Sequence, residues 1–192
     1  MTRCFNGPVT GPNFVAGIFV GGHSERMGGR PKGLLTHEGE TLVARWVRVL
    51  VALGGAPVLV GHAVAYADVG IEVIADAEVD CGPLGGLVAL LERARGGVAI
   101  AVACDMPYVS GALVRRLLDA PAAPAVAARR GWAWEPLFSR WDSSRALDVA
   151  RARMGRRELG LQGLLDALGA ATLDTGGRDA ELDDWDRPED VR

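Results

Sequence analysis

The sequence predicts one α/β domain in which helices cover both faces of a mostly parallel β-sheet. Short runs rich in valine, isoleucine and alanine alternate with stretches whose apolar residues recur at helical spacing, and this alternation is typical of β-α units. The chain has 192 residues, of which 49% are hydrophobic, so it can bury one sizeable core. Neither an internal repeat nor a long linker divides it. We therefore expect a single domain over residues 1–192, with a flexible extension over residues 1–13.

Four predicted strands lie in the first half of the chain, and each is almost continuously apolar. Helices on both faces of a sheet bury both rows of side chains, so such a strand does not alternate between apolar and polar residues. The four runs are Phe14 to Val20, Pro57 to Gly61, Ile71 to Ala75 and Val98 to Ala103. They are expected to form the parallel part of the sheet.

Two predicted helices connect these strands as crossovers. The first spans Thr41 to Leu53 and the second spans Leu84 to Ala94. Each places its apolar residues on one face, as a helix packed on a sheet does. The apolar face of the first contains Leu42, Trp46, Val49, Leu50 and Leu53.

The second half of the chain is less regular but continues the alternation. The expected helices are Ser110 to Leu118, Ser143 to Met154 and Leu161 to Leu168. The expected strands are Ala125 to Ala128, Trp132 to Arg140 and Ala171 to Leu173. The final segment, LDDWDRPEDVR, contains a proline followed by acidic residues, which is typical of the first turn of a helix.

The charge of the chain argues against a nucleic-acid partner. Its formal net charge is -3, whereas a surface that neutralises many phosphates needs an excess of lysine and arginine. No run of eighteen apolar residues is present, and the first fourteen residues lack the charged start and apolar middle of a signal peptide. We therefore expect a cytoplasmic protein that binds neither nucleic acid nor membrane.

The three cysteines, Cys4, Cys81 and Cys104, are expected to be free thiols. They form no C-x-x-C pair, and an odd number cannot all pair within one chain. Cys104 lies between an apolar run and an aspartate, which favours a small buried side chain. A nucleophilic role for it needs a nearby histidine, and the spacing of the three histidines singles out none.

A glycine-rich segment, GGHSERMGGRPKGLL, directly follows the first predicted strand. Its glycines, including Gly21 and Gly22, allow backbone N–H groups to approach phosphate oxygens. Ser24 adds a hydroxyl, and Arg26 and Lys32 add the positive charges that a triphosphate requires. The segment is interpreted as the phosphate-binding loop of a nucleotide site, in preference to an ordinary solvated turn.

Two common phosphate-binding motifs do not match this segment. A P-loop needs a glycine followed by lysine and then by serine or threonine, and neither Gly28 nor Gly29 is followed in this way. The dinucleotide-binding fingerprint G-x-G-x-x-G fits the segment in no frame. The loop is therefore of a different kind.

Aspartates lie where an open α/β sheet binds its ligands, beyond the carboxyl ends of the strands. Asp76 and Asp105 each follow a predicted strand, and Asp186 lies in the late stretch DDWDRPED. Because Mg²⁺ is typically bound by one or two carboxylates together with substrate phosphates, Asp105 is the predicted magnesium ligand and Asp186 a candidate second one. The alternatives are a helix cap for Asp105 and an acidic helix start for Asp186.

The segment DCGPLGGL, residues 80–87, places Gly82 and Pro83 at the start of the second predicted helix. Its glycines allow a base or a ribose to approach the backbone closely. The same sequence is also typical of a purely structural tight turn. Both interpretations stay open.

Taken together, these segments resemble the molybdenum cofactor guanylyltransferases, a MobA-like nucleotidyltransferase family. The family signature L-A-G-G-x-S-x-R-M-G-x-x-K-x-L-L corresponds here to FVGGHSERMGGRPKGLL. Later family landmarks follow in order as VIADAEVDCGPLGGL, VACDMPYVS, EPLF and DWDRPED. The resemblance runs from about Phe14 to the C-terminus, and its most specific parts are the glycine-rich signature and VACDMPYVS.

The resemblance implies a Rossmann-like fold of the nucleotide-diphospho-sugar transferase kind and a magnesium-dependent transfer of GMP from GTP to the terminal phosphate of molybdopterin. Pyrophosphate is released, and the acceptor is molybdopterin or Mo-molybdopterin. An apo-molybdoenzyme or its chaperone is the implied receiver of the product. By position, Phe19, Val20 and Gly21 match the backbone that contacts the nucleotide, and Lys32 matches the phosphate-binding lysine.

Further positions carry over from the same resemblance. Asp76 matches the acidic residue near the nucleotide, and Asp105 matches the magnesium ligand. An asparagine of some family members falls on Gly61, where no side chain can contact the nucleoside. The two asparagines of the family ending N-x-N become Asp184 and Asp186, which resembles the ending of related cytidylyl and sugar-nucleotide transferases.

Alternative functions come from two classes. Among enzymes, one alternative is a molybdopterin cytidylyltransferase, because Pro31 before Lys32 resembles the sequence of that group. Another is a nucleotidyltransferase for a different phosphorylated acceptor, such as a sugar phosphate. The other class is a non-catalytic chaperone that binds nucleotide or cofactor. Lys32 and Asp105 together favour an enzyme, since binding alone does not require the metal carboxylate.

The acceptor is expected to enter over the later half of the chain, beside Glu135 and Pro136. Arg156 or Arg157 is a candidate ligand for its phosphate by charge and by the fork geometry of guanidinium. The alternative is that both arginines lie on an exposed helix face.

Overall fold

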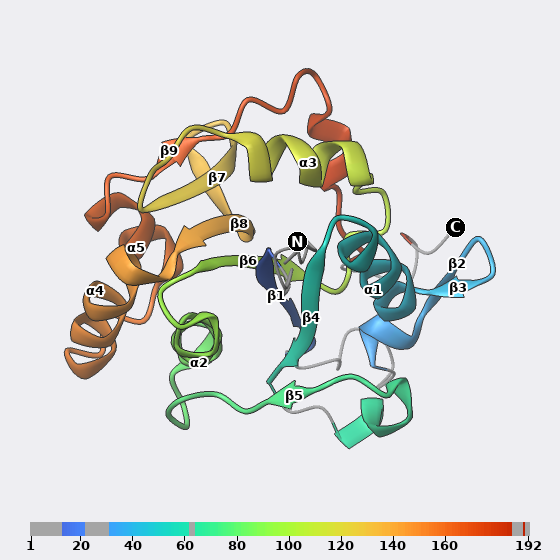
Figure 1. The fold of residues 1–192 in the computed structure, drawn as a ribbon, viewed down its shortest axis with the longest axis horizontal. Coiled ribbons are helices and arrows are strands. Elements are labelled where there is room, and N and C mark those ends of the chain that lie inside the picture. The colour runs from blue at the N-terminus through green and yellow to red at the C-terminus, as the bar shows by residue number, and fades with distance from the viewer. Residues whose placement is uncertain (1–12, 22–30, 62–63, 186–189, 191–192) are drawn as a thin grey trace, which may run out of the picture.

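One seven-stranded sheet with helices against both of its faces makes up the described chain (Figure 1). The structure is a computed structural model that describes residues 13–21, 31–61, 64–185 and 190. The strand order is β5-β4-β1-β6-β8-β7-β9. A two-stranded hairpin of β2 (Thr36–His37) and β3 (Glu40–Thr41) lies apart from this sheet.

The four apolar runs of the first half form the parallel part of the sheet, as predicted. β1 (Phe14–Phe19) lies between β4 (Gly55–Val60) and β6 (Val98–Ala103), and the short β5 (Val73–Ile74) pairs with the other edge of β4. All of these neighbours run parallel. The four central residues of β6 are buried, which explains why its sequence is continuously apolar.

β8 (Ala133–Asp142) runs against its neighbours in the described sheet. It pairs antiparallel with β6 and with β7 (Ala125–Arg130), while β9 (Ala171–Thr172) pairs parallel with β7. Gly131, which has a φ of 61°, and Trp132 join β7 to β8. Such a short connection permits only antiparallel pairing. The sheet is mostly parallel, as predicted, and its reversal places residues of β8 beside the end of β6.

Helices cover both faces of the sheet, as predicted (Figure 1). α1 (Leu42–Ala52) and α3 (Gly111–Asp119) pack on one face, and α2 (Gly82–Ala94), α4 (Ser143–Gly155) and α5 (Leu161–Ala167) pack on the other. Each group forms one apolar cluster with the strand residues that point toward it. The two clusters hold the central strands rigidly between them.

Helices α1 and α3 begin at side chains that cap them. The hydroxyl of Thr41 accepts a hydrogen bond from the N–H of Ala44 (3.2 Å), and the hydroxyl of Ser110 accepts one from the N–H of Leu113 (3.2 Å). Each cap satisfies an N–H group that has no partner within its helix. The predicted starts at Thr41 and Ser110 are confirmed as the cap positions.

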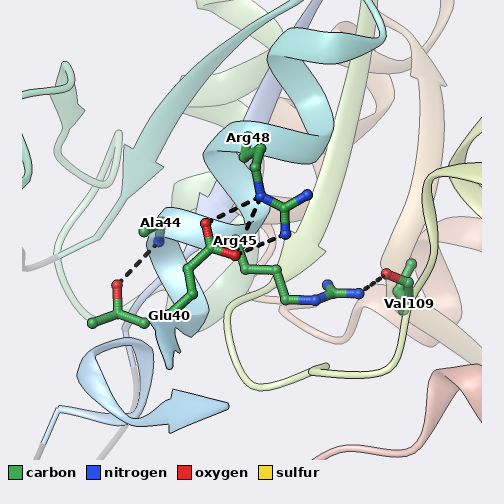
Figure 2. Close-up of polar contacts among 6 residues, drawn as sticks. Glu40, Ala44, Arg45, Arg48 and Val109 are labelled. Atoms are coloured by element: carbon green, nitrogen blue, oxygen red, sulfur yellow. Dashed lines mark hydrogen bonds and ion pairs between the residues drawn. The ribbon is translucent and has the colours of Figure 1, made fainter. Parts of the chain in front are cut away.

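Two arginines of α1 fix this helix to neighbouring segments (Figure 2). Arg48 forms an ion pair of 2.7 Å with Glu40. Arg45 donates a hydrogen bond to the carbonyl of Val109, which belongs to the segment after Asp105. Helix α1 therefore helps to position the chain that follows the predicted magnesium ligand.

Short elements complete the fold and are absent from the sequence predictions. The β2-β3 hairpin turns through Glu38 and Gly39, which have φ angles of 51° and 83°. The described part of the chain also contains the 3₁₀ helices η2 (Lys32–Leu34), η3 (Val64–Val69) and η4 (Asp179–Leu182). Elements of this length are too short to show a hydrophobic period. The predicted extension over residues 1–13 lies outside the described residues except for Asn13.

Gly17 in β1 has no room for a side chain. An added Cβ would lie 2.7 Å from Leu90 Cδ2 and 2.8 Å from Val60 Cγ2, so the core would have to shift. We predict that Gly17→Ala lowers the free energy of unfolding by about 1–3 kcal/mol, measured by urea denaturation. Gly155→Ala is the matched control, because nothing lies within 4 Å of a Cβ at that position. Equal stability of the two variants would contradict the packing of α2 on β1.

Candidate active site

A cavity of about 290 Å³ opens at the carboxyl ends of β1 and β6. One wall contains five residues predicted for the site, namely Phe19, Val20, Gly21, Lys32 and Asp105. A second wall consists of Glu135 and Pro136, which were expected beside the acceptor, and Leu137 of β8, and Asp184 also lines the cavity. The structure thus brings the predicted nucleotide-contacting backbone, lysine and aspartate into one cavity, and it adds a carboxylate-bearing wall.

An ion pair between Lys32 and Asp105 spans the first wall. Lys32 Nζ lies 2.7 Å from Asp105 Oδ2, and the two side chains are 20% and 15% exposed. Partial burial strengthens the attraction because less water screens the charges. Either charge would be poorly solvated after separation, so a ligand that separates the pair must offer replacement partners.

Backbone hydrogen bonds hold Asp105 at the end of β6. The N–H of Cys104 donates to the carbonyl of Phe19 (3.1 Å), which extends the parallel pairing of β6 with β1. The N–H of Trp185 donates to the carbonyl of Asp105 (2.9 Å), and its indole N–H donates to the hydroxyl of Tyr108 (3.1 Å). The late segment around Trp185 is therefore packed against the loop that carries Asp105.

Lys32 lies in η2, and a buried tyrosine fixes this turn. The hydroxyl of Tyr66 accepts a hydrogen bond from the N–H of Gly33 (3.2 Å). A Cβ at Gly33 would lie 2.5 Å from Val43 Cγ2 and 2.9 Å from Tyr66 Cε1, so only glycine fits. Burial raises the pKa of Tyr66 to about 12, which keeps its hydroxyl neutral at physiological pH. The backbone next to Lys32 is held by this bond and by close packing.

Cys104 is a small buried side chain, as predicted. It is 5% exposed, and burial together with the nearby charge of Asp105 raises the pKa of the Cys104 thiol to about 12. Because the thiolate is the nucleophilic form, this thiol is unreactive at neutral pH. Cys81 is also a buried free thiol, and Cys4 lies outside the described residues.

Gly61 and Gly21 meet where the chain leaves β4 and β1. Gly61 has a φ of 107°, and its N–H donates to the carbonyl of Ile74 (3.0 Å). A Cβ at position 61 would lie 3.4 Å from Gly21 Cα and from Gly21 N. Position 61 has no side chain, and its backbone conformation favours glycine.

Asp76 lies beside this region, outside the cavity lining. The N–H of Ala77 donates to the carbonyl of Gly85 (3.1 Å), which ties the segment after β5 to the start of α2. A Cβ at Gly86 would lie 3.0 Å from both Asp76 Oδ1 and Phe19 Cε1, so glycine lets these two groups approach each other. Asp76 is therefore near the end of β1, on the β4 side.

Gly82 and Pro83 lie at exposed positions in the first turn of α2. Gly82 has a φ of 54°, and nothing lies within 4 Å of a Cβ added there. Glycine is therefore favoured at position 82 by the positive φ angle, since there is room for a side chain there. Neither residue lines the cavity that holds Lys32 and Asp105.

The two arginines considered for the acceptor phosphate lie away from the cavity lining. Arg157 donates to the carbonyl of Asp80 (3.1 Å) and to Cys81 Sγ (3.3 Å), and so secures the segment before α2. Arg156 pairs with Glu158 (2.8 Å) at the exposed end of α4. The structure therefore favours the exposed surface position for Arg156 over a role in binding the acceptor phosphate. Arg157 instead stabilises the loop before α2.

Four predicted site residues, Gly22, Ser24, Arg26 and Asp186, lie outside the described residues. The predicted C-terminal helix does too, apart from Asp190. The described geometry of the site therefore rests on the ends of the phosphate-binding segment and on the strand ends around it.

β8 contributes to the cavity through an irregularity in its pairing. Ala127 of β7 pairs with Ser139, but the next residue, Ala128, pairs with Glu135, so extra residues of β8 bulge out. The hydroxyl of Ser139 donates to the carbonyl of Pro136 (2.6 Å) within this bulge. Neighbouring residues of a regular strand point to opposite faces, whereas here three consecutive residues reach one cavity.

Glu135 is paired with Arg130 in this wall. Arg130 Nε lies 2.9 Å from Glu135 Oε1, and the same guanidinium contacts Asp183 (3.2 Å) and donates to the carbonyl of Leu182. Burial raises the pKa of Glu135, and this effect is opposed by Arg130 and reinforced by the charge of Asp184. The wall holds a partly buried carboxylate, which distinguishes it from a phosphate-binding surface.

Asp184 lines the same cavity as Asp105 and is absent from the predicted site residues. The sequence feature that points to Asp184 is its position, which matches the first asparagine of the family ending N-x-N. Mg²⁺ takes one or two carboxylates together with substrate phosphates, and these two carboxylates fit such a site. Within the described ranges, no three His, Cys, Asp or Glu side chains group closely enough to bind a metal by themselves. Substrate oxygens would therefore have to complete the coordination.

Comparisons with known proteins agree with this geometry. The sequence model of the MobA-like NTP transferase domain matches residues 16–172. The chain belongs to this family. Molybdenum cofactor guanylyltransferases from Pseudomonas putida and Pseudomonas entomophila are each 34% identical to this MobA-like chain over 90% of its length, which covers 92% and 93% of theirs.

Solved structures share the fold of this MobA-like chain. Molybdopterin-guanine dinucleotide biosynthesis protein A from Archaeoglobus fulgidus superposes with a TM-score of 0.75 at 19% identity, covering 92% of this chain and 94% of that one. The 2-C-methyl-D-erythritol 4-phosphate cytidylyltransferase from Thermus thermophilus superposes with a TM-score of 0.62 at 18% identity, with coverages of 91% and 94%. These likenesses confirm the predicted fold class. None of the helices in the described part combines the length and apolar character that crossing a bilayer requires.

Removal of the Tyr66 hydroxyl tests how η2 is held. In Tyr66→Phe the buried N–H of Gly33 loses its acceptor, and we predict a loss of about 1–3 kcal/mol in the free energy of unfolding at neutral pH. Because the pKa of Tyr66 is raised from 10 to about 12 in the folded chain, its contribution is full below pH 10 and is lost as pH rises toward 12. Urea denaturation should therefore show a gap between wild type and variant that narrows over this range. A gap that widens would contradict the assigned burial.

Proposed function

We propose that this chain transfers GMP from GTP to the terminal phosphate of molybdopterin or Mo-molybdopterin and releases pyrophosphate. The observation that carries the proposal is the Lys32–Asp105 pair at the carboxyl end of the sheet, in a chain of the MobA-like NTP transferase family. Relatives named molybdenum cofactor guanylyltransferase, at 34% to 37% identity over 90% of the chain, support these substrates.

The transfer begins with in-line attack of an acceptor phosphate oxygen on the α-phosphorus of GTP. A bond forms between this oxygen and the α-phosphorus while the bond to the bridging oxygen breaks, and the electron pair leaves with pyrophosphate. The acceptor phosphate is already ionised, so the step needs no strong general base. Catalysis then depends on positioning and on neutralisation of charge.

Lys32 is assigned to the triphosphate. Phosphate oxygens replace Asp105 as the partner of its ammonium group, so that the lysine stays paired in its partly buried position. The N–H of Gly22, the hydroxyl of Ser24 and the guanidinium of Arg26 are assigned to the same phosphates. Together these groups orient the α-phosphorus and stabilise the charge on the leaving pyrophosphate.

The carboxylates of Asp105 and Asp184 are assigned to Mg²⁺, with Asp186 as a further ligand. Their hard oxygens at the cavity fit this ion, and the ion when bound adds positive charge beside the phosphates. Asp105 thus has two roles. It neutralises Lys32 before the nucleotide binds and holds the metal afterwards.

The nucleoside is assigned to the β4 side of β1. The backbone of residues 19–21 and that of Gly61 approach each other there, without a side chain at position 61. Asp76, Gly82 and Pro83 border the same side and are assigned to the ribose or the base. The reaction is placed in the cytoplasm, and an apo-molybdoenzyme or its chaperone receives the product.

Replacement of Asp105 tests the proposed metal site. We predict that Asp105→Asn lowers turnover by about 100-fold or more, because a neutral amide holds Mg²⁺ poorly and removes the carboxylate that pairs with Lys32. Asp174→Asn is the matched control, since Asp174 is 85% exposed and pairs with Arg116 far from the cavity. Unchanged turnover and magnesium dependence in Asp105→Asn would show that the metal site is assigned wrongly.

Pyrophosphate release from each nucleoside triphosphate, with and without molybdopterin, tests the whole function. The expected result is release from GTP that requires both molybdopterin and Mg²⁺. A preference for CTP would favour the cytidylyltransferase alternative. Nucleotide binding without release under any condition would favour a non-catalytic chaperone.

A further inference from the structure

Glu135 and Asp105 come to the cavity from neighbouring strands. β6 and β8 pair antiparallel as far as Val102 and Phe138; Asp105 lies just beyond the end of β6, and Glu135 lies in β8 beside the bulge. Both residues line the cavity. Glu135 therefore approaches the reacting centre from the β8 side, across from the strands assigned to the nucleoside.

Phosphate is a poor ligand for the wall that carries Glu135. The partly buried carboxylate of Glu135 repels an anion. In the described ranges the cation paired with Glu135 is Arg130, which also contacts Asp183 and the carbonyl of Leu182. The phosphates of both substrates are therefore expected at the Lys32 end of the cavity.

The carboxylate of Glu135 retains hydrogen-bonding capacity for a ligand. Its Oε1 is the oxygen nearest to Arg130 (2.9 Å), and Oε2 accepts no hydrogen bond from a residue in the described ranges. The side chain is 22% exposed and lines the cavity, so a ligand in the cavity can reach this oxygen. A carboxylate oxygen accepts hydrogen bonds, and adjacent N–H groups fit its geometry well.

Both substrates of the proposed reaction carry such donors. Guanine and a 2-amino-4-oxopteridine each place an amino group next to a ring N–H, and a carboxylate accepts this pair with two parallel hydrogen bonds. The strand order separates the two rings, because Gly61 and Asp76 follow β4 and β5 on one side of β1 and Glu135 lies on the other side. The donors that meet Glu135 therefore belong to the acceptor.

We propose that Glu135 selects the acceptor by accepting two hydrogen bonds from the amino and ring N–H groups of its 2-amino-4-oxopteridine ring, a role that rests on the function proposed above. Arg130 orients the carboxylate through Oε1, and the bulge of β8 brings it to the cavity. Glu135 is thereby a specificity residue for the acceptor. The substitution of Glu135 affects acceptor binding and leaves GTP binding unchanged.

Inhibition of GMP transfer by free pterin and free lumazine tests this role. Lumazine carries an oxo group in place of the 2-amino group, so it faces the carboxylate with an oxygen. We expect pterin to inhibit the wild type about tenfold more strongly than lumazine does, and Glu135→Gln to lose or reverse this preference. The same variant should raise the acceptor KM about 10- to 100-fold and change the GTP KM less than twofold.

Two further variants separate recognition from structural support. Glu92→Gln removes a carboxylate that pairs with Arg151 (2.8 Å) on the surface, and it should behave as the wild type. Arg130→Gln breaks the pair with Glu135 but keeps the carboxylate, so it should weaken the preference for pterin without abolishing it. Equal loss of preference in Arg130→Gln and Glu135→Gln would make Glu135 a structural partner of Arg130 and overturn the proposal.

Other outcomes also decide the question. If Glu135→Gln raised the GTP KM and left the acceptor KM unchanged, Glu135 would bind guanine and not the acceptor. If pterin and lumazine inhibited the wild type equally, the proposed hydrogen bonds between Glu135 and the pterin ring would not form. Failure of the proposed function is distinct, since the wild type would then release no pyrophosphate from GTP and molybdopterin. Direct titration of wild type and Glu135→Gln with pterin and lumazine would still measure the preference in that case.

Discussion

The ion pair between Lys32 and Asp105 joins two segments that are 73 residues apart in the sequence, and the geometry of the cavity depends on it. β6 must pair with β1 to carry Asp105 to the edge of the sheet, and η2 must pack against Tyr66 to carry Lys32. In this partly buried position each charge needs a partner. Magnesium and a triphosphate offer new partners to both charges, so we expect substrate binding to exchange the pairing without leaving either charge unpaired.

The order of the strands gives the cavity two chemically different sides. On the β4 side, Gly21 and Gly61 bring two backbone segments together, and the surface suits close contact with a nucleoside. On the β8 side, the partly buried carboxylate of Glu135 suits a ligand with N–H donors. Two substrates can thus meet at one phosphorus atom while their rings are recognised by different chemistry on opposite sides of Asp105.

Much of the fold could be predicted because its causes are local. Burial on both faces leaves an unbroken apolar run in β1 and β6, and the caps Thr41 and Ser110 mark the starts of their helices. The direction of β8 and the bulge that exposes Glu135 depend on pairing with distant strands, so no local pattern indicates them. Asp184 reaches the cavity because the N–H of Trp185 bonds the Asp105 loop, a contact between segments far apart in the sequence.

A crystal structure of the complex with Mg²⁺ and α,β-methylene GTP measures the exchange of partners directly. If the pair works as described, Lys32 Nζ will lie within hydrogen-bond distance of the β- or γ-phosphate, and an Asp105 oxygen will lie about 2.0–2.1 Å from the metal. A complex in which the two side chains keep their separation of 2.7 Å, with the phosphates bound elsewhere, would contradict it.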